Sequence, residues 1–224
     1  MPVRRADDPI ATEFMFGLTV VAFVASMIYS ATLGGVEAWY VFADDTASVA
    51  AGEWWRVITG AFLHDGPFHL AMNMLFIWVF GSALEARLGK VGLVALYMAG
   101  LLGGALGVVW LSNPLGVPVG ASGAGFALMG ALVVLQITQG VNLWSSGLGG
   151  LVLLNVVVTL AFRGSISVGG QLGGFVAGVV AGVVLFAAPR SQLPRSARVA
   201  IVGAGAVFLF GLTIASASAR MGAI

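Results

Sequence analysis

Long apolar segments alternate with short polar ones along almost the whole chain. The apolar segments run almost without charged residues for close to the ~20 residues that a helix needs to cross ~30 Å of hydrocarbon. The pattern therefore predicts an all-α fold, a polytopic membrane helix bundle. We place seven spans, at Phe14–Leu33, Phe68–Leu84, Val91–Leu111, Ser122–Thr138, Leu148–Phe162, Gly169–Ala188 and Arg198–Ala217.

Composition supports the membrane assignment and narrows the chemistry. The chain is 59% hydrophobic and 8% charged, which is more apolar surface than a soluble domain of this size can bury. It contains no cysteine, so disulfides, a thiol nucleophile and thiolate metal sites are excluded. The net charge of +1 gives no electrostatic reason to expect nucleic acid as a partner.

The basic residues predict an orientation, because Lys and Arg accumulate in cytoplasmic loops. A cytoplasmic N-terminus and an outer C-terminus leave only Arg56, Arg163 and Arg220 outside. The cytoplasmic set is then Arg4, Arg5, Arg87, Lys90, Arg190, Arg195 and Arg198. We expect a multi-pass protein of the plasma membrane. Its expected parts are a cytoplasmic segment (1–13), a six-helix membrane domain (14–188), a cytoplasmic linker (189–197) and a seventh helix with a tail (198–224).

Small residues recur inside the spans. Gly174, Gly178 and Gly182 repeat every four residues and form one smooth helix face. Helices in lipid pack closely through such faces, so this pattern by itself predicts a tight bundle and no chemistry.

Chemistry has to come from the few polar groups at membrane depth, which are costly to bury there. His69 and Asn73 share one helix face, Ser122 opens a span in the sequence VGASGAGF, and Gln171 begins another. Each has a purely structural interpretation. A serine at a helix start is most often an N-cap, and His, Asn and Gln often join membrane helices by hydrogen bonds.

Together these groups indicate acyl transfer. A hydroxyl at a helix N-terminus between Gly120 and Gly123 lets a carbonyl approach backbone N–H groups, and His69 and Asn73 add donors for an oxyanion. A metal site on His64, Asp65 and His69 is not favoured, since neither the spacing nor a third good donor supports it.

Four motifs carry a resemblance to a known family. GASG at 120–123, HLAMN at 69–73, EWWR at 53–56 and QLGGFVAG at 171–178 resemble the rhomboid intramembrane serine proteases. The resemblance runs from Phe14 to Ala188 and implies a six-helix core plus one C-terminal transmembrane helix. It also implies that the clients are transmembrane segments of other membrane proteins, and that no metal or organic cofactor is used.

The resemblance also implies roles. Ser122 matches the nucleophile, and His69 and Asn73 match the oxyanion stabilisers. Supporting positions are Gly120 and Gly123 beside the serine, Phe126 as the ring packed on the base, Gly174 and Gly178 as packing glycines, and Trp55 with Arg56 as a structural pair at the membrane surface.

The general base is where the sequence departs from the family. The family keeps a histidine where this chain has Gln171, and a carboxamide cannot accept a proton near neutral pH. Hydrolysis is then expected to be impaired, unless His69 takes over as base. The alternative is a non-catalytic pseudoprotease that binds or chaperones transmembrane clients. If Gln171 is an introduced His-to-Gln change, the natural protein would be active.

Overall fold

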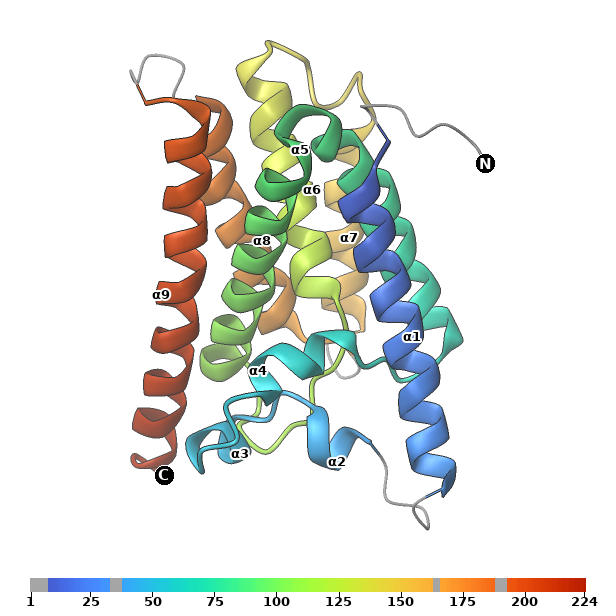
Figure 1. The fold of residues 1–224 in the computed structure, drawn as a ribbon, viewed down its shortest axis with the longest axis vertical. Helices are drawn as coiled ribbons and strands as arrows, with labels where there is room; N and C mark the ends of the chain where they lie inside the picture. Colours follow the sequence, from blue (N-terminus) through green and yellow to red (C-terminus); the bar gives the residue numbers. More distant parts are fainter. Residues whose placement is uncertain (1–7, 33–37, 163–165, 188–192) are drawn as a thin grey trace.

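The computed structural model describes residues 8–32, 38–162, 166–187 and 193–224. Within them the regular structure is entirely helical, and the long helices run side by side along the long axis (Figure 1). The predicted all-α membrane bundle is confirmed. The elements are α1 (Ile10–Thr32), α2 (Trp39–Phe42), α3 (Thr46–Ala50), α4 (Arg56–Thr59), the 3-10 turn η1 (Gly60–Phe62), α5 (Pro67–Leu111), α6 (Ser122–Thr138), α7 (Leu148–Ala161), α8 (Val168–Gly182), the π turn η2 (Val183–Ala187) and α9 (Arg195–Met221).

The second and third predicted spans form one element, α5, which reverses direction at Gly89. This residue has φ 63° and ψ 175°, far from helical values, and divides α5 into two limbs. α1, α5, α8 with its π turn, and α9 are long and apolar enough to cross a membrane. α6 and α7 are shorter apolar helices of 17 and 14 residues. All seven predicted spans therefore correspond to helical segments.

α1 begins at Ile10, four residues before the apolar run that predicted it. The cause is Glu85 on α5, a buried residue whose carboxylate accepts hydrogen bonds from the backbone N–H groups of Ala11 and Thr12, each at 2.8 Å. The Thr12 hydroxyl donates to the same carboxylate at 2.8 Å. The first N–H groups of a helix lack intrahelical partners, so a carboxylate placed there stabilises an earlier start.

Helices α5, α6 and α8 form the centre of the bundle with their backbones in direct contact. A Cβ added to Gly174 would lie 2.1 Å from the Gly123 carbonyl oxygen, and one added to Gly178 would lie 2.1 Å from the Ala127 carbonyl oxygen. On the other side of α8, a Cβ added to Gly107 of α5 would lie 2.1 Å from the Gly169 carbonyl oxygen. The glycine faces thus bring three helices together as predicted.

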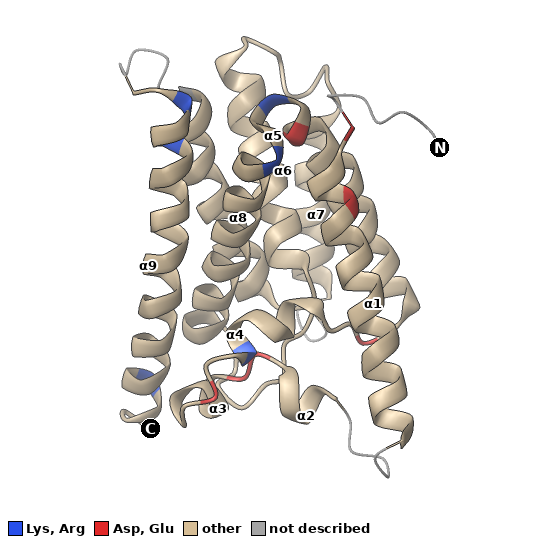
Figure 2. Ribbon diagram, in the orientation of Figure 1, with Lys and Arg blue, Asp and Glu red and all other residues tan. Residues whose placement is uncertain are grey.

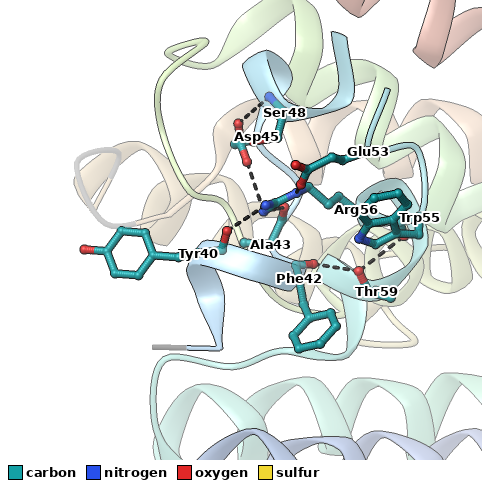
Figure 3. Close-up of polar contacts among 9 residues, drawn as sticks. All are labelled: Tyr40, Phe42, Ala43, Asp45, Ser48, Glu53, Trp55, Arg56 and Thr59. Atoms are coloured by element: carbon teal, nitrogen blue, oxygen red, sulfur yellow. Dashed lines mark hydrogen bonds and ion pairs between the residues drawn. The ribbon is translucent and has the colours of Figure 1, made fainter. Parts of the chain in front are cut away.

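The described part of the loop between α1 and α5, residues 38–66, is organised around Arg56 and is called the first loop below. The Arg56 side chain is buried and pairs with Glu53 and Asp45 at 2.5 and 3.2 Å (Figure 3). It also donates to the backbone carbonyls of Tyr40 and Ala43 at 2.6 and 3.3 Å. One guanidinium group therefore fixes the residues around α2, α3 and α4.

The seventh span, α9, packs along α5 and reaches the first loop. The rings of Trp54 and Phe210 meet edge to face with centroids 6.2 Å apart. Near the end of α9, Arg220 donates to the Ser112 carbonyl oxygen at 2.9 Å, just beyond the end of α5. The last helix thus contacts both the six-helix core and the first loop.

Charged residues gather at the two ends of the bundle (Figure 2). At the end opposite the first loop, Arg87 and Lys90 flank the turn of α5 at Gly89 and Arg195 and Arg198 begin α9, and acidic residues lie near this end as well (Figure 2). The first-loop end carries Arg56 and Arg220 with four acidic residues, Asp44, Asp45, Glu53 and Asp65. Arg4, Arg5, Arg163 and Arg190, which also entered the orientation argument, lie outside the described residues.

Candidate functional site

Ser122 is the first residue of α6, and this helix begins inside the bundle, above α4 in Figure 1. Ala121 occupies the N-cap position and no side chain caps the helix, so the interpretation of Ser122 as only an N-cap is wrong. Gly120 has φ +114°, which lets the chain turn into α6 where a side chain would be strained. The Ser122 hydroxyl therefore lies beside backbone N–H groups that are free to stabilise negative charge.

His69 and Asn73 of α5 lie over this turn. A Cβ added to Gly120 would lie 2.8 Å from His69 Nε2 and 3.7 Å from Asn73 Nδ2. Asn73 Nδ2 also donates to the His69 carbonyl oxygen at 3.0 Å. The glycine makes room for both side chains, and the structure brings them to within two residues of Ser122.

Asp65 fixes the protonation pattern of the His69 ring. Its carboxylate oxygen lies 2.7 Å from His69 Nδ1. A carboxylate only accepts, so Nδ1 carries the proton, and Nε2 of a neutral ring is then an acceptor. With Nδ1–H directed to Asp65, Nε2 donates to an oxyanion only when it too carries a proton. This pairing was not predicted from the sequence, where Asp65 was weighed only as a metal ligand.

His64 lies beside the same turn and is 4% exposed. Its Nε2 accepts from the Ala121 N–H at 3.5 Å, and its ring meets the His69 ring edge to face at 5.0 Å. Burial lowers the pKa of His64 to about 4, with the neighbouring His69 adding to the effect. His64 is therefore neutral near pH 7 and acts as a backbone acceptor.

Gln171 is buried on α8, and its side-chain oxygen accepts a hydrogen bond from the Thr159 hydroxyl of α7. A residue at the position of the family's general base would be directed at Ser122, but the side-chain bond of Gln171 goes to α7 instead. Among the described residues, none is hydrogen-bonded to the Ser122 hydroxyl. Phe126, one turn after Ser122, is buried against Phe76 of α5, with ring centroids 6.1 Å apart.

Ser122 lines a small cavity of about 40 Å³ between α5, α6, α8 and the first loop. Asp44 of the first loop lines the same cavity and is 6% exposed. Burial raises the pKa of the Asp44 carboxyl to about 8, and the charge of Asp45 adds to the shift. Asp44 was not predicted from the sequence as a site residue. Its only signal was the acidic pair in ADDT, because burial of one member cannot be read from the sequence.

The raised pKa predicts a pH-dependent stability. The folded protein holds a proton on Asp44 that the unfolded chain releases near pH 3.8, so stability falls as pH rises from about 4 to about 8. Each pH unit in this window costs about 1.4 kcal/mol. Asp44→Asn should remove this dependence and melt at a higher temperature than wild type at pH 8, with a smaller gain at pH 5. Thermal unfolding in detergent at both pH values checks this, and equal gains would contradict it.

Ser122 thus lies at the N-terminus of a helix inside a bundle of apolar helices, several of them long enough to cross a membrane. The chain belongs to the rhomboid family, since residues 51–188, more than half of its length, match the Rhomboid domain.

Named relatives extend this match. Rhomboid protease GluP of Bacillus subtilis is 29% identical over 180 residues, covering 77% of this chain and 33% of that protein. Rhomboid protein 1, mitochondrial, of Saccharomyces cerevisiae is 37% identical over 84 residues, covering 35% and 24%. Inactive RHOMBOID-like protein 8 of Arabidopsis thaliana is 30% identical over 112 residues, covering 49% and 31%. The chain thus spans about a third or less of these relatives.

Proposed function

We propose that this chain is a rhomboid-type serine endopeptidase scaffold that receives transmembrane segments of membrane proteins within the bilayer, with hydrolysis impaired. One observation carries the proposal: Ser122 lies at the recessed N-terminus of α6, beneath His69 and Asn73, while Gln171 is bonded to Thr159. A nucleophile with oxyanion donors and no paired base is equipped for acyl transfer but poorly activated.

Each residue has a role in this proposal. The Ser122 hydroxyl attacks the client carbonyl, and the Ser122 backbone N–H, His69 and Asn73 stabilise the oxyanion. Gln171 holds the place of the base without accepting a proton. Loss of one member of such a constellation costs on the order of 10⁴ to 10⁶ in kcat, while an oxyanion hole and binding retain ~10³ to 10⁴ over water.

A non-catalytic client-binding protein is the second candidate. It is favoured by the Thr159–Gln171 bond, which gives Gln171 a structural task between α7 and α8 that needs no chemistry. A relative whose name marks it as inactive fits the same interpretation. The intact arrangement of Ser122, His69 and Asn73 favours the impaired enzyme, because a binder needs no oxyanion site.

The topology is part of the proposal. The basic residues at the end opposite the first loop support a cytoplasmic N-terminus, an outer C-terminus and a site that opens toward the outer face of the plasma membrane (Figure 2). The division into a six-helix domain at 14–188 and a seventh helix at 198–224 is proposed with it.

Wild-type protein and Ser122→Ala, reconstituted in liposomes with a reporter transmembrane substrate at pH 7, test the function. We expect little or no wild-type cleavage, none by Ser122→Ala, and equal crosslinking of both to the substrate. Rapid Ser122-dependent turnover by wild type would contradict the proposal that hydrolysis is impaired.

A further inference from the structure

Asp44 is a buried acid on the wall of the cavity that Ser122 lines. Its side chain is 6% exposed, and within the described part of the chain its Oδ1 is buried with no hydrogen-bond partner. Buried polar atoms are nearly always paired, so an orphaned carboxylate oxygen on a cavity wall points to a ligand or a water there. The same cavity is lined by Ser122.

The charges around Asp44 are engaged elsewhere. Asp45 accepts from the Ser48 N–H at 2.7 Å and pairs with Arg56, and Arg56 also binds Glu53 and two carbonyl groups (Figure 3). The parts of α5, α6 and α8 that line the cavity contribute no charged residue. On α9, Arg220 is directed to the Ser112 carbonyl. Asp44 is therefore the ionisable group on the cavity wall.

Backbone contacts through Gly60 fix the position of Asp44 relative to the turn that precedes Ser122. A Cβ added to Gly60 would lie 2.6 Å from the Asp44 backbone nitrogen, so the backbone at Asp44 lies directly against η1 within the first loop. The Gly60 carbonyl in turn accepts from the Gly120 N–H at 3.0 Å, two residues before Ser122. The carboxyl group is thus fixed relative to the serine by two close contacts.

We propose that Asp44 is the proton acceptor for Ser122, acting through water held in the shared cavity. This inference rests on the proposed function, because it assigns the base that Gln171 does not provide. The volume of about 40 Å³ accommodates two or three water molecules at about 10–15 Å³ each. Asp44 Oδ1 and the Ser122 hydroxyl supply polar partners for them.

The proton balance of the step is simple. As the Ser122 oxygen bonds to the client carbonyl carbon, its proton passes to a cavity water, and that water gives a proton to the Asp44 carboxylate. When the acyl–nitrogen bond breaks, the proton returns by the same path to the leaving amine. Water then attacks the acyl-enzyme with Asp44 again as acceptor, and Ser122 recovers its hydroxyl.

The protonation of Asp44 sets the pH dependence. Because burial raises its pKa to about 8, most Asp44 is protonated at pH 7 and only the minority carboxylate can act. The rate should rise about tenfold per pH unit below that value and level off above it. This behaviour is consistent with slow chemistry near neutral pH.

Covalent labelling of Ser122 by a fluorophosphonate probe tests the inference without a client. The serine oxygen bonds to phosphorus, fluoride leaves, and the proton goes to the base. Rates are measured between pH 6 and 10 for wild type, Ser122→Ala, Asp44→Asn and the matched control Asp45→Asn. We expect slow wild-type labelling with a plateau above about pH 8, none for Ser122→Ala, and at least a tenfold loss at pH 8 without a plateau for Asp44→Asn. Asp45→Asn should keep the plateau, with the profile displaced to lower pH because the charge of Asp45 adds to the raised pKa of Asp44.

Several outcomes would overturn the inference. Equal rates for Asp44→Asn and wild type at every pH would do so, as would a wild-type rate that climbs without a plateau or is undetectable. Asp44→Ser serves as a second variant if Asp44→Asn fails to fold, which its melting temperature reports. In those cases, labelling of Gln171→His by the probe at pH 7 would show that the proposed function still holds and that only the role of Asp44 is wrong. If Gln171→His is labelled no faster than Ser122→Ala, the proposed function itself is wrong.

Discussion

Gln171→His should raise Ser122-dependent cleavage of a reporter transmembrane substrate by about 10³-fold or more at pH 7. Imidazole accepts a proton near neutral pH and carboxamide does not. Gly174 and Gly178 hold the helix that carries residue 171 against α6, which begins at Ser122. A histidine at position 171 serves Ser122 when its ring turns away from Thr159 of α7, the partner of Gln171.

Initial cleavage rates in liposomes, compared among wild type, Gln171→His and Gln171→Asn, measure the effect. Gln171→Asn is the matched control, because it keeps an amide and should stay as slow as wild type. Adding Ser122→Ala to Gln171→His should abolish the gain. If Gln171→His remains inactive even with Thr159→Val, which frees residue 171 from α7, the site is a remodelled binding site.

Gly178→Ala should be the most damaging single-methyl change in the bundle. The new Cβ would lie 2.1 Å from the Ala127 carbonyl oxygen and 2.4 Å from the Ala127 Cα, both backbone atoms of α6 that no rotamer change can move. Overpacking a core costs about 1–3 kcal/mol, and a backbone clash belongs at or above the upper end. We expect a loss of about 3 kcal/mol of stability and a displaced α8.

Unfolding titrations in mixed micelles, with Gly203→Ala as control, check this expectation. Gly203 lies on α9, where an added Cβ meets nothing within 4 Å, and alanine favours the helix there. The control should be neutral or slightly more stable than wild type. Equal stability of the two variants would mean that α6 and α8 are not in backbone contact.

The sequence predicted the long helices well because the thickness and the apolar interior of the bilayer set their length and composition. Each segment meets that requirement by itself. It misplaced the start of α1, since the capping carboxylate of Glu85 lies 74 residues from Ala11. The short helices of the first loop were not anticipated either. Their order depends on Arg56, whose partners lie up to 16 residues away.

In the candidate site, too, the features set by local sequence were predicted and those set by contacts between distant segments were not. Ser122, His69 and Asn73 were identifiable because each sits in a short motif with its own helical spacing. The Asp65–His69 pair, the Thr159–Gln171 bond and the burial of Asp44 were not, because each depends on how a side chain meets a neighbouring segment. Polar contacts of this kind follow only after the helices are placed.

On α8, the residues that pack the helix against α6 differ from the residue at the base position, so the two can evolve independently. A side chain at Gly174 or Gly178 would clash with the backbone of α6, whereas the side-chain hydrogen bond of Gln171 goes to a side chain of α7. Histidine and glutamine codons differ at the third base alone. A lineage with this scaffold can therefore exchange an imidazole for a carboxamide at position 171, and reverse the exchange, by one nucleotide change, while selection on the glycine face keeps the fold intact.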